Sequence, residues 1–169
     1  MKTIHFTSVI YFYLVFLTSG LTASTFHLKY DSLSCLEIEG KITNLDAGAN
    51  DCFVELISKD GILDSIVLKE GKRRFKFVLK RDTYYAIRIT KKGFVTKLIS
   101  INTEVPTDSD VLYRFQFDTE LMNKSFSKRL NKDALDFPVA IICFDYEKKF
   151  FFYDKQYSAN VKRDLYSKN

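Results

Sequence analysis

Few side chains in this sequence are suited to acid–base or nucleophilic chemistry. The 169 residues include two histidines, and only His27 lies beyond the first two dozen positions. Histidine is the usual general base near neutral pH, and a hydrolytic triad needs such a base beside its nucleophile. No set of residues here meets that requirement. The sequence therefore predicts a protein that is not an enzyme, with no catalytic residues and no cofactor.

Three cysteines, an odd number, are the remaining reactive side chains. No Cys-x-x-Cys pair and no Cys/His spacing points to a metal site, so none is predicted. Cys52 and Cys143 lie in apolar alternating runs, where buried free thiols are expected. A bridge between Cys35 and Cys52 would need strand neighbours that bring their Cα atoms within about 7 Å. The sequence leaves the pairing of the three cysteines open.

Aromatic side chains are better candidates for a binding surface. The chain has 16 Phe and 10 Tyr but no Trp. Such rings anchor interfaces when exposed, although most of them pack inside a core. For each aromatic candidate, packing in the core or across strands is therefore the alternative to a role in binding. Strand alternation leaves five as candidates for outward positions and for contact with a ligand or partner: Tyr84, Tyr113, Tyr146, Phe151 and Tyr153.

The N-terminus has the order of features found in a secretory signal. Lys2 precedes an unbroken apolar run at Val9–Leu17, and small residues follow it. This order predicts a signal peptide at residues 1–24, with cleavage after Ala23 or Ser24. A membrane-spanning helix needs about 20 apolar residues, so no stable transmembrane anchor is expected after cleavage. The protein is predicted to be secreted, periplasmic or associated with the outer membrane.

The charge of the chain is mildly basic, with a formal net charge of +5. Its lysines and arginines are interleaved with acids, as in KEGKRRFKFVLKRD, and no basic helix or RNA-binding aromatic signature is present. We therefore expect no nucleic-acid partner. Charged strand faces that discourage edge pairing explain this pattern.

Alternation of apolar and polar residues dominates the middle of the chain. It is clearest in the runs LEIEGKI, CFVELIS, RFKFVLK and TYYAIRIT. This period of two is typical of strands that bury one face, and turns at intervals of about 8–12 residues indicate a sandwich or barrel. The predicted inner residues are Leu36, Ile38, Ile42, Cys52, Val54, Leu56, Phe75, Phe77, Leu79, Tyr85, Ile87 and Ile89.

A mostly polar stretch at 121–136 separates this region from the C-terminal tail, and we predict a linker there. Met122, Phe126 and Leu130 recur every fourth position within it. That spacing fits either one helical face or a loop with three apolar anchors.

The tail itself has a different pattern. The nearly continuous apolar run Phe137–Phe144 predicts a strand covered on both faces. Glu147–Lys149 is expected to turn the chain back into a hairpin with the segment FFFYD. From Lys155 onward, apolar residues at every fourth position predict a final amphipathic helix with Asp154 as its N-cap.

Gly40 and the runs at 52–56, 75–79, 85–89 and 92–94 together form a pattern similar to that of a known family. They resemble the transthyretin-like, carboxypeptidase regulatory-like (prealbumin-like) domains of exported Bacteroidetes proteins, over roughly Glu39 to Thr103. The resemblance implies a seven-stranded antiparallel β-sandwich that serves as a structural or recognition module. Cys52 stands where the family commonly has Ala. Glu70-Gly71-Lys72 replaces the usual Asp-Gly, and no loop suited to calcium is present.

These observations predict three parts after the signal peptide: a sandwich domain at 35–120, the linker at 121–136, and a strand-hairpin-helix extension at 137–169. The predicted fold is mainly β, a transthyretin-like seven-stranded antiparallel sandwich with a C-terminal hairpin and short helix. The predicted function is a noncatalytic exported structural or protein-interaction module of the bacterial cell envelope, with a protein partner there. The alternative is a carbohydrate-binding module that uses exposed Tyr and Phe on the sandwich or tail.

Overall fold

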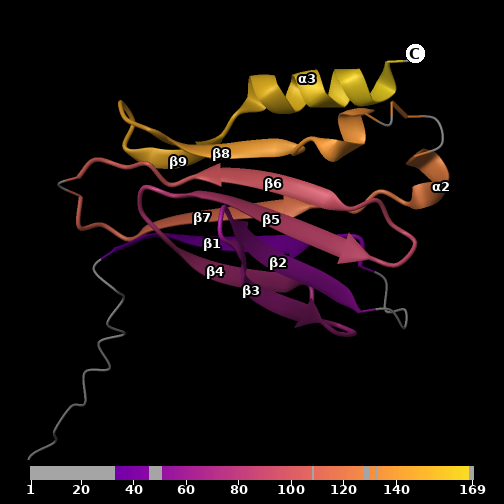
Figure 1. Ribbon diagram of the computed structural model, residues 1–169, viewed down its shortest axis with the longest axis horizontal. Coiled ribbons are helices and arrows are strands. Elements are labelled where there is room, and N and C mark those ends of the chain that lie inside the picture. The colour runs from indigo at the N-terminus through magenta and orange to yellow at the C-terminus, as the bar shows by residue number, and fades with distance from the viewer. Residues whose placement is uncertain (1–32, 46–50, 108, 128–129, 132, 168–169) are drawn as a thin grey trace, which may run out of the picture.

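The computed structural model (Figure 1) describes residues 33–45, 51–107, 109–127, 130–131 and 133–167. The predicted signal peptide at 1–24 lies outside these residues, as does His27. The strands of the described part are β1 (Ser34–Ile42), β2 (Cys52–Ser58), β3 (Gly61–Leu68), β4 (Arg74–Lys80), β5 (Tyr84–Lys91), β6 (Lys97–Asn102), β7 (Tyr113–Thr119), β8 (Ala140–Asp145) and β9 (Phe150–Tyr153). Its helical segments are α2 (Lys124–Ser127), the 3-10 helix η1 (Asp133–Asp136) and α3 (Lys155–Tyr166). No helix in these ranges is long and apolar enough to cross a membrane.

The strands form two sheets that pack as a β-sandwich. The larger sheet has six strands in the order β3-β2-β5-β6-β8-β9, and the smaller has three in the order β4-β1-β7. The prediction of a mainly β sandwich is confirmed at this level. The predicted C-terminal hairpin is also confirmed, and it continues the larger sheet because β8 pairs with β6.

The expectation of a wholly antiparallel sandwich is wrong at two pairs of strands. β1 and β7 run parallel, with Leu36 beside Tyr113. β6 and β8 are also parallel, with Ile99 beside Ala140. Both pairs join strands that are not consecutive in the chain. Alternation predicts which face a residue occupies, but it carries no information on the direction of the neighbouring strand.

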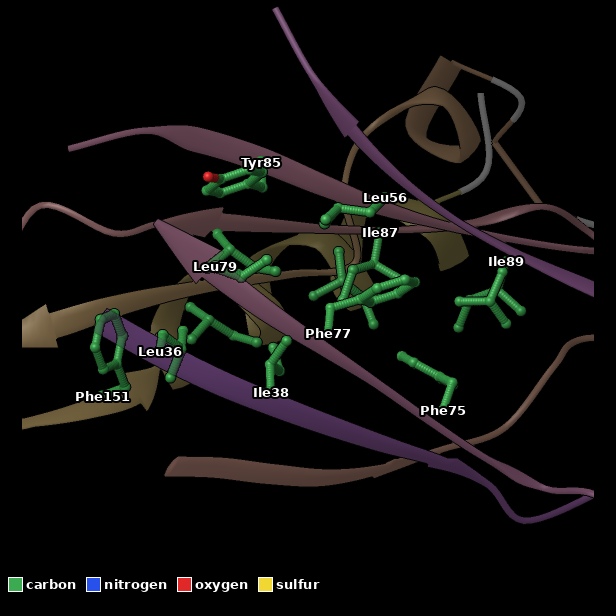
Figure 2. Packing of buried hydrophobic residues seen from close by; sticks show 14 of the residues in the cluster. Leu36, Ile38, Leu56, Phe75, Phe77, Leu79, Tyr85, Ile87, Ile89 and Phe151 are labelled. Atoms are coloured by element: carbon green, nitrogen blue, oxygen red, sulfur yellow. The ribbon is translucent and has the colours of Figure 1, made fainter. Parts of the chain in front are cut away.

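The hydrophobic core lies between the sheets, where alternation predicts it. Every one of the predicted inner residues is at most 6% exposed. Figure 2 shows Ile38 of β1 and Phe77 of β4 in one interior cluster with Leu56 and Ile87 of the other sheet. Burial of one such aliphatic or aromatic side chain stabilises the fold by about 1.5–3 kcal/mol.

The predicted order of elements in the tail is confirmed, but the predicted burial of its first strand, β8, is not. Phe137 is 59% exposed and lies before β8, while Ile141 on the strand is only partly buried. The strand is therefore not covered on both faces as predicted, because α3 packs on β8 and covers only part of one face in the described part of the chain. The predicted cap of α3 is present, since Asp154 Oδ1 accepts a hydrogen bond from Tyr157 N at 2.9 Å.

The segment predicted as a linker contains the short elements α2 and η1. The expectation of three apolar anchors is wrong at Phe126, which is 65% exposed. Leu121, just before it in the chain, is buried in the main core instead. A helical face of three evenly spaced residues does not form here because α2 is only 4 residues long.

Candidate functional site

Two of the five aromatic candidates lie in the interior between β7 and the hairpin. Phe151 is 5% exposed, so the expectation that it points outward is wrong. It lies opposite Phe144 across the hairpin, and the two ring centroids are 5.3 Å apart. Tyr113 of β7 is partly buried and packs edge-on against both, at 5.0 Å from Phe144 and 5.7 Å from Phe151. These rings hold the hairpin against the smaller sheet.

Two other candidates, Tyr84 and Tyr146, are exposed and are linked through one short segment. Tyr84 is 69% and Tyr146 is 55% exposed. Asn102 Nδ2 donates to Tyr84 Oη at 3.4 Å, and Asn102 Oδ1 accepts from Glu104 N at 3.0 Å. Tyr146 Oη donates to the Glu104 carbonyl oxygen at 3.5 Å. A chain of hydrogen bonds thus joins two exposed rings from β5 and the β8–β9 turn.

The phenol of Tyr146 stays protonated near neutral pH. Its pKa is raised, first by desolvation and then by the negative charges of Glu104 and Asp82. Tyr153, the fifth candidate, is 45% exposed and lines a separate groove beside Phe115 and Phe117 of β7. Of the five aromatic candidates, the hydrogen-bond chain therefore joins only Tyr84 and Tyr146.

An exposed apolar surface on β2 and β3 is not among the binding candidates that strand alternation predicts. We call it the β3 patch, and it contains Phe53, Ile62, Leu63 and Val67. These four side chains are between 40% and 55% exposed. Phe53 lies directly opposite Val67 in the β2–β3 ladder. The signal for this surface is present in the run GILDSIVL, since apolar residues occupy both faces of that strand rather than one.

The outer edge of β3 differs from the other free edges of the described sheets. In β4, three of the four exposed residues are basic, namely Arg74, Lys76 and Lys80. β7 exposes Arg114 and Asp118, and β9 has only 4 residues. Charged side chains and short length both protect an edge from pairing with another chain. β3 has 8 residues, no basic side chain and one exposed acid, Asp64, and its ladder with β2 has a bulge at Leu63. In the described part of the protein it pairs with β2 alone.

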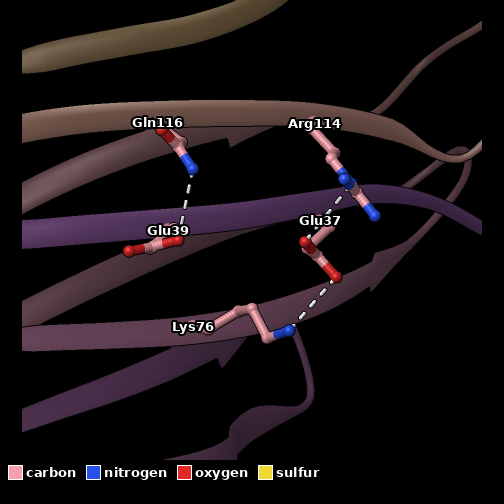
Figure 3. Close-up of polar contacts among 5 residues, drawn as sticks. All are labelled: Glu37, Glu39, Lys76, Arg114 and Gln116. Carbon is pink, nitrogen blue, oxygen red and sulfur yellow. Dashed lines mark hydrogen bonds and ion pairs between the residues drawn. The ribbon is translucent and has the colours of Figure 1, made fainter.

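The outer face of the smaller sheet, by contrast, carries paired charges (Figure 3). Lys76 Nζ lies 3.3 Å from one carboxylate oxygen of Glu37, and Arg114 Nε lies 3.6 Å from the other. Gln116 Nε2 donates to Glu39 Oε2 at 3.3 Å. Each exposed pair of this kind contributes about 0–1 kcal/mol. Since both carboxylates are engaged from neighbouring strands, these contacts help to align the three strands of the sheet.

The cysteines offer no activated nucleophile. All three are free thiols; Cys35 and Cys52 are buried, whereas Cys143 is only partly buried, less than expected. Burial raises the pKa of Cys35 and of Cys52 to about 11. Burial also raises the pKa of Cys143, assisted by the charges of Asp154 and Asp145. A protonated thiol is a poor nucleophile and a poor metal ligand. Among the described residues, no three His, Cys, Asp or Glu side chains are grouped so as to hold a metal ion.

No protein-family model matches the chain, and a search of curated proteins found no relative. The resemblance to transthyretin-like domains therefore stays a prediction, based on Gly40 and the strand pattern that follows it in the sequence.

Proposed function

We propose that the protein is a noncatalytic exported interaction module of the cell envelope, of the transthyretin-like kind, that binds a protein partner by adding a strand to β3. The N-terminal apolar run supports export, and the strand pattern around Gly40 supports the family. The observation that carries the binding mode is the long edge of β3, which has exposed apolar side chains and lacks protective basic residues. Such an edge is a template for an additional strand, because main-chain hydrogen bonds supply affinity and the side chains supply register.

The partner that this edge fits best is a second copy of the chain. In an antiparallel pair about a two-fold axis, residue i of one strand faces residue j of the other and the reverse also holds. If Ser65 faces Ser65, then Asp64 faces Ile66, and Leu63, which the bulge in the β2–β3 ladder leaves without a partner on β2, comes nearest to Val67. This register brings the apolar side chains of Leu63 and Val67 together and puts no like charges face to face, which is favourable for cross-strand pairs. An edge-to-edge contact buries little area, so an affinity on the order of micromolar is expected.

The test is a charge exchange at two exposed positions. A variant with both Leu63→Lys and Val67→Lys places lysines opposite lysines in the dimer, whereas Leu63→Lys with Val67→Glu places lysine opposite glutamate. Sedimentation equilibrium should show a dimer for the parent protein, a dissociation constant raised at least about tenfold for the double-lysine variant, and recovery for the lysine–glutamate variant. A parent protein that stays monomeric at millimolar concentration contradicts the proposal, and so does equal weakening by both variants. Circular dichroism checks that the exposed substitutions leave the fold intact.

Carbohydrate binding is the second candidate, and the linked pair Tyr84 and Tyr146 favours it. Exposed rings stack on sugar faces, while Asn102 and Glu104 between them supply polar atoms of the kind that sugar hydroxyls bind. Affinity electrophoresis on a panel of polysaccharides should then show retardation that Tyr84→Ala and Tyr146→Ala each reduce at least about threefold, given the loss of one aromatic contact. Tyr166→Ala, at an exposed tyrosine of α3, is the matched control. Migration unaffected by every polysaccharide would exclude this candidate for the glycans in the panel.

A further inference from the structure

Helix α3 lines a partly open cavity against the sandwich. Its inner residues Val161 and Leu165 pack with Ala134 of η1 in a small cluster that is separate from the main core. A cavity of about 540 Å³ lies between this cluster and the sandwich, where Leu121 and Val139 form the opposite wall. We call this space the α3 cavity. Sites for small molecules typically measure about 300–1,000 Å³ and are lined mainly by apolar side chains.

Lys97 brings a positive charge to the lining of this cavity. Its Nζ donates a hydrogen bond to Thr119 Oγ1 at 2.9 Å and another to the carbonyl oxygen of Glu120. An ammonium group has three N–H donors, and no residue in the described ranges accepts the third. The pKa of Lys97 is lowered because burial disfavours its charged form, although the nearby charge of Glu120 acts in the opposite direction. A second negative group would therefore stabilise the ammonium.

Ser158 of α3 supplies a second polar atom without a partner. Its Oγ is buried and makes no hydrogen bond with the described residues. Ser158 and Val139 line both the α3 cavity and the neighbouring groove of about 400 Å³ beside β7. The two spaces are therefore neighbours along one side of the sandwich, which favours an elongated molecule over a compact one.

The charges around the α3 cavity set the sign of its ligand. Lys97 and the exposed Lys162 line it together with a single carboxylate, Glu120, which leaves a net charge of one positive unit. We propose that the α3 cavity binds an aliphatic monocarboxylate, with the carboxylate on Lys97 Nζ and the hydrocarbon chain against Leu121, Val139 and Val161. Burial of the chain supplies affinity, since it removes apolar surface on both partners from water. The charged hydrogen bond to the lysine supplies selectivity for an acid over a neutral molecule of the same length.

The test compares dodecanoate with dodecanol on the whole protein by isothermal titration calorimetry, below the micellar concentration of the acid. Dodecanoate should bind saturably at one site, at least about tenfold more tightly than the alcohol, as one charged hydrogen bond requires. Lys97→Met should reduce the affinity for dodecanoate to that for the alcohol, whereas Lys97→Arg keeps the charge and should retain the preference. Val161→Phe, which fills the cavity, should weaken both ligands. Lys155→Met, at an exposed lysine on the same helix, is the matched control and should change neither.

Absence of saturable binding to the parent protein overturns this proposal, and so does equal affinity for the acid and the alcohol. A preference for the acid that survives in Lys97→Met also overturns it, since the carboxylate would then lie elsewhere. If circular dichroism shows that Lys97→Met is unfolded, the comparison of Lys97→Arg with Val161→Phe decides. Dodecanoate binding that is retained in Lys97→Arg and weakened in Val161→Phe supports the site, and any other result contradicts it. Self-association through β3 is measured separately, so the two proposals succeed or fail independently.

Discussion

Replacement of Gly40 by valine is expected to lower the free energy of unfolding by about 3 kcal/mol, the upper end of the usual cost of overpacking a core. Gly40 lies at the centre of the smaller sheet, between the rings of Phe75 on β4 and Phe117 on β7. A Cβ atom at this position would lie 2.2 Å from Phe75 Cζ and 2.8 Å from Phe117 Cζ. Phe75 is only 3% exposed, so its ring cannot move aside without disturbing the core. Urea denaturation monitored by circular dichroism measures the loss.

A compensating substitution tests whether the steric clash is the cause. Phe75→Leu removes the ring that the new side chain would strike, and on its own it is expected to destabilise the protein by leaving a void. The double variant with Gly40→Val and Phe75→Leu should be more stable than the sum of the two single losses predicts. Coupling of about 1 kcal/mol or more is typical for residues in direct contact. Additive losses, or a Gly40→Val protein with the urea midpoint of the parent, would show that the strand accommodates the side chain.

Thr103→Val is expected to lower the free energy of unfolding by about 1–3 kcal/mol, because it removes a buried hydroxyl that hydrogen-bonds two backbone groups and takes away the partner of Thr83 N. Thr103 is fully buried at the end of β6. Its Oγ1 lies 2.7 Å from the carbonyl oxygen of Lys80, to which it can donate, and accepts from Thr83 N at 3.1 Å. The backbone of the same residue accepts from Asp82 N at 3.0 Å. One hydroxyl thereby joins the end of β4 and the β4–β5 turn to the larger sheet.

The matched control keeps the hydroxyl and removes only the methyl group. Thr103→Ser should retain these hydrogen bonds and lose about 1 kcal/mol from the reduced burial of one carbon. Thr103→Val lacks the hydroxyl, whereas Thr103→Ser lacks the methyl group. Thermal and urea unfolding of the two variants therefore compare the contribution of the hydrogen bonds to stability with that of the packing. Equal stability of the valine and serine variants would mean that the hydroxyl makes no net contribution.

Much of the local structure could be predicted from the order of residues alone. Alternation in the middle of the chain assigned Leu36, Ile38 and their counterparts on other strands to the buried face, and all of them are there. The N-cap of α3 and the turn between β8 and β9 were predictable for the same reason. The face of the sheet that a strand residue occupies, a helix cap and a tight turn each depend on residues within a few positions of one another.

Only the tertiary structure decided which strands became neighbours and which faces stayed uncovered. Six strands of one sheet face three of the other, so Ile62, Leu63 and Val67 of β3 remain exposed although the strand's sequence pattern resembles that of a buried strand. Phe151 is buried because Tyr113, 38 positions earlier in the chain, packs against it. The α3 cavity likewise depends on where a C-terminal helix meets Lys97 of β6. Pairing partners, edges and cavities arise from contacts between distant segments, and the periodicity of one segment contains no information about the other.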